Sequence, residues 1–274
     1  MVKAALGAAG GVAAAGLAWS VFEAQWVDLV ERDLPVPGLP AELDGLRVLH
    51  LSDFHLGTLS LNGRAVRRAT AWPAAREADL VAITGDLVSR RGGERQLRQA
   101  LARLGARHGV FAVLGNHDVA QTRDPFSRPG EFRGLDGARL LEHETASFVV
   151  GGRTVQVVGC DPRRRLDPVE ELADPDADLR ILLAHFPDVA DRLRPGVFEL
   201  VLAGHLHGGQ ICLPTPRGRL RLSHPSKPWW EGVHELPGAT LHVSRGLGTT
   251  FVPFRFLARP EATVLTLRVS TRLE

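Results

Sequence analysis

The sequence predicts an α/β domain, because short apolar runs alternate with helical stretches and each run ends in polar or glycine-containing residues. The runs are too short for helices and are bounded like strands buried on both faces. They lie at residues 47–51, 80–84, 110–114, 154–158, 179–184, 200–203 and 241–244. Between some of them, residues 61–78 and 93–105 form arginine-rich amphipathic stretches typical of helices. Pro73 must kink or break the first of these helices.

Length and composition are those of a globular chain. Its 274 residues are 44% hydrophobic and 23% charged, and a net charge of +2 gives no reason to expect a nucleic-acid partner. Two cysteines, Cys160 and Cys212, cannot build a disulfide framework or a cysteine-rich zinc site, so two buried free thiols are favoured over one bridge. With no internal repeat, one domain is predicted at residues 41–274, and its oligomeric state stays open.

The N-terminus differs from the rest of the chain. The uncharged stretch AALGAAGGVAAAGLAWSVF lies between Lys3 and Glu23, and a helix of about 20 apolar residues can cross a bilayer. We therefore expect a membrane anchor or signal segment at residues 1–22 and a linker at 23–40 that includes the proline-rich LPVPGLP. Lys3 before the stretch and acidic residues after it favour a domain outside the cytoplasm. A peripheral anchor, or a buried alanine-rich helix in a cytoplasmic protein, is the alternative.

Polar residues that can do chemistry follow five of the predicted strands. These strand ends carry Asp53-Phe54-His55, Gly85-Asp86, Gly115-Asn116-His117-Asp118, His185 and Gly204-His205-Leu206-His207. Ligands of open α/β sheets gather beyond the carboxyl ends of the strands. A single cluster of this kind is typical of an ordinary capped turn, but five in succession favour one common site. His50, just before the first cluster, is interpreted as a strand residue that points to the opposite face.

This residue set predicts a metal site. Carboxylate oxygens and imidazole nitrogens without thiolates suit Mn, Fe or Zn. Asp53 and His55 are two residues apart, so on an extended chain both can point one way, and His205 and His207 repeat that spacing. Seven ligands exceed what one ion accepts, so we expect two ions that share a bridging ligand. Two ions about 3.5–4 Å apart are a recurring device for phosphoester hydrolysis, in which a bridging hydroxide attacks phosphorus.

The order of these residues resembles that of the calcineurin-like metallophosphoesterases over residues 47–209. The stretches GHLHGGQICLP and SRGLGTTFVPFRFLARPE are similar to a bacterial branch whose members often carry an N-terminal membrane segment. The resemblance implies a sandwich of two mixed β-sheets flanked by helices, with the metals at the strand ends. Leu206, where that branch often has threonine, is a departure expected to affect the substrate head group rather than metal binding.

The resemblance also implies a role for each site residue. It assigns Asp53, His55 and His207 to the first metal, Asn116, His185 and His205 to the second, and Asp86 to a bridge between them. His117 would protonate the leaving oxygen, and Asp118 would orient and charge its ring. The favoured ions are two Mn ions.

The complete ligand set predicts a metal-dependent phosphoesterase, and a phosphodiesterase is favoured. Residues 221–235, RLSHPSKPWWEGVHE, would offer a cationic aromatic edge to a lipid-linked phosphodiester through Lys227, Trp229 and Trp230. A packed loop with two core tryptophans is the alternative. A UDP-sugar-lipid pyrophosphatase of the lipid A type is the alternative activity. A non-catalytic scaffold with this fold, which would bind a partner protein, is the alternative from another class.

Overall fold

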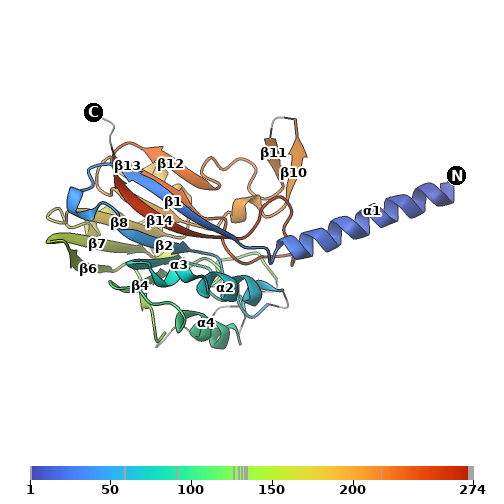
Figure 1. Cartoon of the computed structure of the whole chain (residues 1–274), viewed down its shortest axis with the longest axis horizontal. Helices are drawn as coiled ribbons and strands as arrows, with labels where there is room; N and C mark the ends of the chain where they lie inside the picture. The colour runs from blue at the N-terminus through green and yellow to red at the C-terminus, as the bar shows by residue number, and fades with distance from the viewer. Residues whose placement is uncertain are drawn as a thin grey trace.

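Two mixed β-sheets packed face to face form the body of the computed structural model (Figure 1). The structure describes residues 2–58, 60–90, 92–125, 127–128, 130, 132, 135–216 and 218–270. The prediction of an α/β sandwich of two mixed sheets is confirmed, and the predicted strands all occur with small shifts of their ends.

The first sheet contains six strands within the described residues. In spatial order they are β1 (Asp28–Val36), β14 (Glu261–Val269), β2 (Arg47–Leu51), β3 (Leu80–Thr84), β4 (Val110–Val113) and β5 (Arg139–Leu140). Strands β2 to β5 run parallel to one another, whereas β14 pairs antiparallel with β2 and parallel with β1.

The second sheet also contains six strands in the described part of the chain. Their spatial order is β12 (Gly232–Leu236), β13 (Ala239–Val243), β9 (Leu200–Ala203), β8 (Leu179–Ala184), β7 (Arg153–Cys160) and β6 (Thr145–Val150). The four central strands are parallel, and the two edge strands are antiparallel to their neighbours. A separate hairpin joins β10 (Cys212–Thr215) to β11 (Gly218–Arg221).

Helices cover the outer face of the first sheet. They are α2 (Asn62–Thr70), α3 (Pro73–Arg76) and α4 (Gly93–Leu101). Pro73 is the first residue of α3, so the break predicted there is confirmed. Short 3₁₀ helices and loops lie over the second sheet and between strands; the 3₁₀ helices are η1 (Ala41–Leu43), η2 (Pro162–Arg164), η3 (Val169–Leu172), η4 (Pro187–Arg192) and η5 (His207–Gly209).

Alternation along the strands divides the core into layers. In β3, Leu80 and Ala82 face the second sheet, while Val81 and Ile83 face the helices. Successive side chains of a strand point to opposite faces, so a strand that is apolar throughout must be covered on both. Both cysteines, Cys160 and Cys212, are buried free thiols, as expected.

Residues 28–36, which the sequence analysis placed in a linker, instead form the edge strand β1. The strand pairs along its whole length with β14, and Leu34 and Val36 are fully buried between the sheets. Pro35 fits here because an edge strand does not need every backbone N–H for pairing. The proline-rich composition that suggested a linker therefore reflects an edge position in the sheet.

Residues 2–23 form helix α1 (Val2–Glu23), which projects from the body of the molecule (Figure 1). The Ala258 N–H donates to Oε1 of Glu23 at 2.7 Å, and the Arg255 N–H donates to the carbonyl of Ser20 at 3.1 Å. These contacts tie the last turn of α1 to the loop before β14. Among the residues that the structure describes, no helix combines the length and the apolar character that crossing a membrane requires.

Candidate metal centre

The five predicted strand ends converge at one edge of the sandwich. Asp53, His55, Asp86 and His207 each offer a ligand atom within 4.8 Å of the others, and Asp86 forms a second group of this kind with His185 and His205. The first sheet supplies the residues that follow β2 and β3, and the second sheet supplies those that follow β8 and β9. The two sheets therefore meet at Asp86, which belongs to both groups.

In the first group, nitrogen and oxygen atoms face one another across short gaps. Nε2 of His55 lies 3.1 Å from Nε2 of His207 and 3.4 Å from Oδ2 of Asp86. Nε2 of His207 lies 3.3 Å from Oδ1 of Asp53. All four side chains are buried.

The second group is built in the same way. Nε2 of His185 lies 3.3 Å from Oδ2 of Asp86, 2.9 Å from Oδ1 of Asn116 and 3.1 Å from Nδ1 of His205. All seven predicted ligands therefore lie in one connected cluster, in which Asp86 belongs to both groups.

The hydrogen bonds of His185 show that this cluster fits a cation. Its Nδ1 lies 2.8 Å from the carbonyl oxygen of Thr84, which can only accept, so Nδ1 carries the proton. In the neutral ring, the lone pair of Nε2 then points at the oxygens of Asp86 and Asn116, which is unfavourable unless a proton or a metal cation lies between them. A carbonyl that fixes the tautomer in this way is typical of metal-binding histidines. The donor set of Asp, Asn and His side chains suits a divalent metal centre.

The ionisation states agree with that arrangement. Burial alone would raise the pKa of Asp53, but the imidazoles of His207 and His185 hold it well below its usual range. Asp86 is likewise held below its usual pKa against the effect of burial, chiefly by His185 and His117. Burial alone would lower the pKa of His185, but Asp86 and Asp53 raise it to about 9. A proton on His185 thus takes the place of the positive charge that the two carboxylates favour.

Several predicted ligands have left-handed backbone rather than the extended backbone expected of an Asp-x-His spacing. The φ angles are 53° at Asp53, 44° at His55, 53° at Asp86, 75° at His205 and 51° at His207. This region is uncommon for residues with a side chain. The ligands are therefore aimed by tight turns after the strands, not by the pleat of the strands themselves.

Two glycines allow these turns to approach one another. A Cβ atom at Gly115 would lie 2.1 Å from Oδ1 of Asp86, and a Cβ atom at Gly204 would lie 2.5 Å from Oδ2 of Asp53. Each glycine therefore lies where any side chain would collide with a carboxylate of the cluster.

His117 lies beside the cluster. Its Nε2 is 4.0 Å from Oδ2 of Asp86, and its ring centroid is 4.6 Å from that of His55. Hydroxyl groups hold the ring: Oγ of Ser127 lies 3.0 Å from Nδ1, and Oγ1 of Thr122 lies 3.1 Å from Nε2. Burial lowers the pKa of His117 against the opposing effect of Asp86.

Asp118 does not contact the ring of His117, contrary to the role expected for it. Its carboxylate accepts backbone N–H groups of Leu87, Val88 and Gly115 at 2.8–3.1 Å. Burial and the nearby Asp86 raise its pKa to about 7, although these amides oppose the shift. Asp118 therefore joins the turn after β4 to the turn after β3, and it acts on His117 only through the backbone.

The sequence analysis missed Arg255, which is fully buried. Its guanidinium donates to the backbone carbonyl of His207 at 3.1 Å, and Nη2 lies 3.5 Å from Nδ1 of the same histidine. Ser89 was missed as well, and its Oγ lies 2.8 Å from Nδ1 of His55. Arg255 lies within the stretch SRGLGTTFVPFRFLARPE that carries part of the resemblance, but that stretch gave no role to this residue. Each of the two residues reaches its histidine from a distant part of the chain.

The segment predicted to contact substrate is packed against other parts of the surface. Nε1 of Trp229 donates to Asp191 at 2.8 Å, and Lys227 forms an ion pair with Asp188 at 3.3 Å. Trp230 lies beneath the guanidinium groups of Arg219 and Arg221. None of these contacts, all among described residues, involves a predicted metal ligand. His224 of the same segment does reach the cluster, with its ring centroid 5.2 Å from that of His205.

Comparison with known proteins gives one consistent result. Residues 46–209 match the family model of the calcineurin-like phosphoesterases. An uncharacterized metallophosphoesterase from Aquifex aeolicus is 31% identical over 92% of this chain and 95% of its own length. The UDP-2,3-diacylglucosamine pyrophosphatase LpxG of Chlamydia muridarum is 28% identical over 93% of this chain and 94% of its own. The phosphodiesterase YaeI of Escherichia coli is 27% identical over 81% of this chain and 82% of its own.

Proposed function

Because the chain belongs to the calcineurin-like phosphoesterase family and is a phosphoric ester hydrolase, we propose that it is a two-metal phosphodiesterase. Its proposed substrate is a lipid-linked phosphodiester, and its proposed ions are Mn. The observation that carries the proposal is the position of Asp86, whose carboxylate belongs to two adjoining groups of ligand atoms.

In the proposed centre, one ion would be held by Asp53, His55 and His207 and the other by Asn116, His185 and His205. Asp86 would be shared by the two. Two divalent ions at such a site supply Lewis acidity and a nucleophile generated from water. The residues of the chain prearrange this centre, because hydrogen bonds to Ser89 and to the Thr84 carbonyl fix the rings of His55 and His185 before any ligand arrives.

His117 is the proposed proton donor to the leaving oxygen. Nε2 of this ring is the atom nearest Asp86, while Nδ1 is occupied by Ser127. Thr122 and Thr250 lie 3.1 and 3.5 Å from Nε2, so their hydroxyl groups surround the position where the leaving oxygen would be protonated. An anionic phosphoester at this position would favour the protonated ring by direct charge attraction.

An apolar hollow next to His117 supports an amphiphilic substrate. It has a volume of about 230 Å³, and its wall includes Thr250, Phe251, Val252 and Pro253. Phe251 is 53% exposed. The hollow joins the protonation site through Thr250, so an acyl or prenyl portion bound there would leave its phosphate next to the metals.

A UDP-sugar-lipid pyrophosphatase of the lipid A type is the second candidate activity. The similarity to LpxG over almost the full length of both chains favours it, whereas the similarity to YaeI favours a phosphodiesterase. Both activities attack phosphorus and need the same centre, so the choice depends on the leaving group. Lys227, Trp229 and Trp230 are not needed in either case, because the hollow beside Phe251 offers the apolar contact.

Association with a membrane surface is part of the proposal. Near the junction of α1 with the body, Trp19, Phe22 and Trp26 are 45%, 51% and 38% exposed and have ring centroids 5.6–6.1 Å apart. Clustered aromatic rings of this kind favour the interface between lipid and water. The placement of the domain outside the cytoplasm stays a prediction of the sequence.

Substitution of the shared carboxylate tests the function. In Asp86→Asn, we expect turnover of a small aryl phosphodiester to fall at least about a thousandfold, and bound Mn to fall from two equivalents to one or fewer, because a bridge and a charge are lost. Asp33→Asn is the matched control, since Asp33 is a surface carboxylate with 66% exposure. Unchanged turnover in Asp86→Asn would refute the two-metal mechanism.

A substrate screen with the wild type identifies the substrate. It compares turnover of phosphodiesters with acyl chains, UDP-linked lipids and soluble aryl esters, and activity on soluble esters alone would refute the lipid-linked assignment.

A further inference from the structure

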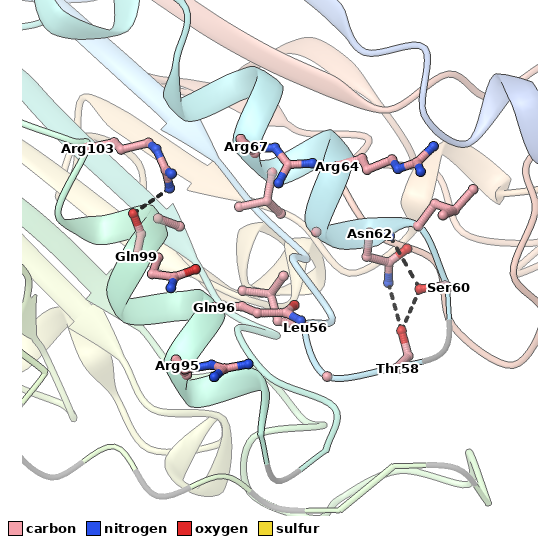
Figure 2. Close-up of a pocket in the computed structure, with 15 residues that line it drawn as sticks. Leu56, Thr58, Ser60, Asn62, Arg64, Arg67, Arg95, Gln96, Gln99 and Arg103 are labelled. Atoms are coloured by element: carbon pink, nitrogen blue, oxygen red, sulfur yellow. Dashed lines mark hydrogen bonds between the residues drawn. The ribbon is translucent and has the colours of Figure 1, made fainter.

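A second, strongly basic hollow lies away from the ligand cluster, between helices α2 and α4. Its volume is about 330 Å³. Figure 2 shows arginine and glutamine side chains from the two helices around it, with residues 56–58 and Ser60 at one end. We call it the α2–α4 groove.

The charge of the groove is not balanced. Its wall contains Arg64 and Arg67 from α2 and Arg95 and Arg103 from the α4 side, and the described residues that line it include no aspartate or glutamate. Arg64 contacts the side-chain oxygen of Gln25, and Arg103 contacts the carbonyl of Gln99. Within the described part of the chain, the guanidinium groups of Arg67 and Arg95 have no hydrogen bond or ion pair.

Helix stability does not explain this arrangement. Arg64 and Arg95 lie in the first turns of the nine-residue helices α2 and α4, where the helix dipole disfavours a positive side chain. The only acidic residue in either first turn, Glu94, accepts the backbone N–H of Gly92 and caps its own helix. Both helices begin at the same edge of the sheet, so their N-terminal ends add to the positive potential of the groove.

Neutral donors complete the groove. The side-chain amides of Gln96 and Gln99 line it, and a Cβ atom at Gly63 would lie 3.2 Å from the side-chain oxygen of Gln96, so the helices approach closely. Amide groups beside several guanidinium groups are a donor set that phosphate oxygens bind, because arginine donates two hydrogen bonds at once to such a group.

We propose that the α2–α4 groove is a binding site for a phosphate-bearing anion, separate from the metal centre. The anion brings the compensating charge that Arg67 and Arg95 otherwise lack. It is either a soluble phosphate compound or the head group of an anionic lipid, since both present the same oxygens. The site is connected to the metal centre, because Asn62 and Thr58 both donate to the backbone carbonyl of the predicted ligand His55.

Paired charge substitutions test the site. The test variant is Arg67→Gln/Arg95→Gln, and the control is Arg68→Gln/Arg98→Gln, which removes the same charge from the same helices at exposed positions outside the groove. Binding of pyrophosphate to chelator-treated full-length protein is measured by calorimetry, and sedimentation with vesicles is measured for phosphatidylglycerol and for phosphatidylcholine. Loss of two charge-assisted contacts predicts affinity at least about tenfold weaker in the test variant and within about twofold of wild type in the control.

The pyrophosphate and vesicle measurements distinguish a soluble anion from a lipid head group. Loss of pyrophosphate binding in the test variant alone supports a soluble ligand, and loss of phosphatidylglycerol binding alone supports a lipid head group. Equal weakening in both variants, no binding by the wild type, or binding that survives in the test variant would overturn the proposal. The site does not depend on the proposed enzymatic function, and turnover of an aryl phosphodiester, which has no second anionic group, is expected to be unchanged in the test variant.

Discussion

Replacing Arg255 with methionine removes the charge that holds the loop behind the predicted metal ligand His207. The guanidinium is fully buried and donates to the backbone carbonyls of five residues. These carbonyls belong to His207, Ala258, Arg245, Gly246 and Gly248, at 2.6–3.2 Å. Methionine fills much of the same space but donates nothing, so the carbonyls lose their partner without a large cavity forming.

The expected loss of stability in Arg255→Met follows from these contacts. A buried polar group left without a partner costs about 1–3 kcal/mol, so five carbonyls give at least about 5 kcal/mol before relaxation. Part of this free-energy cost is recovered, because the mutant no longer buries a charge and because water can enter the loop and bind the carbonyls. Loss of one partner from a buried charged network typically costs about 3–5 kcal/mol, and we expect Arg255→Met to lower the free energy of unfolding by that amount.

Urea unfolding followed by circular dichroism measures this change. A chelator in the buffer ensures that metal binding does not add to the stability of the wild type. Arg268→Met is the matched control: Arg268 is 43% exposed and pairs with Asp33 and Asp44 at the surface. Exposed ion pairs contribute about 0–1 kcal/mol, so the midpoint of the control stays close to that of the wild type.

The same variant reports on the metal centre. Because Arg255 fixes the backbone of His207, we expect weaker binding of the ion assigned to Asp53, His55 and His207, with the other ion retained. Arg255→Lys keeps a charge but has fewer donors, so its stability and metal content lie between those of the wild type and Arg255→Met. An unfolding midpoint and metal affinity equal to those of the wild type in Arg255→Met would refute the role given to this residue.

Three further outcomes follow from the geometry of the site and the core. In Gly115→Ala, the new Cβ meets Oδ1 of Asp86 at 2.1 Å, so turnover falls about a hundredfold or more; Gly105→Ala, at a position with no atom within 4 Å, is the control, and equal activity in the two would contradict this prediction. In Asp118→Asn, the side-chain NH₂ group meets backbone N–H donors, so both stability and metal content fall; loss of turnover with metal content unchanged would instead restore the direct role on His117. Burial lowers the pKa of His242 from 6.5 to about 4, so the folded state binds fewer protons than the unfolded state between these values; the protein therefore loses about 3 kcal/mol of stability as pH falls from about 6.5 to 4, and a denaturation series in which His242→Gln retains the whole of this slope would contradict the assignment.

Periodicity predicted the interior of the fold better than its edges. Strands β2, β3 and β8 are mostly apolar and buried along nearly their whole length, and their limits agree with the predicted runs at 47–51, 80–84 and 179–184. The edge strand β1 contains charged residues and a proline, and the edge strand β6 alternates between exposed and more buried residues. Strand β1 is defined by its pairing with the distant strand β14, and a single sequence does not contain that information.

For the site, the order of the residues along the chain was sufficient to predict which side chains meet. Parallel strands deliver their carboxyl ends to one edge, so clusters at five strand ends must converge. The hydrogen bonds of the residues around the cluster, in contrast, were not predictable from the sequence. Asp118 stands next to His117 in sequence, yet its carboxylate turns to backbone amides, where it accepts from three N–H groups of neighbouring turns that need a partner once they are buried.

The left-handed backbone of the ligands explains why the supporting residues matter so much. A residue with a side chain loses about 1–2 kcal/mol in this conformation, so the values at Asp53, His55, Asp86, His205 and His207 together cost about 5–10 kcal/mol. That amount is similar to the whole stability of a typical domain. It persists only because other contacts fix these turns: Asp118 holds the turn after β3, Arg255 holds His207, and the backbone N–H of His205 donates to Asp53. The predicted ligands are therefore already in place before any ion binds, and part of the energy for their arrangement comes from Asp118 and Arg255, which are not among the predicted ligands.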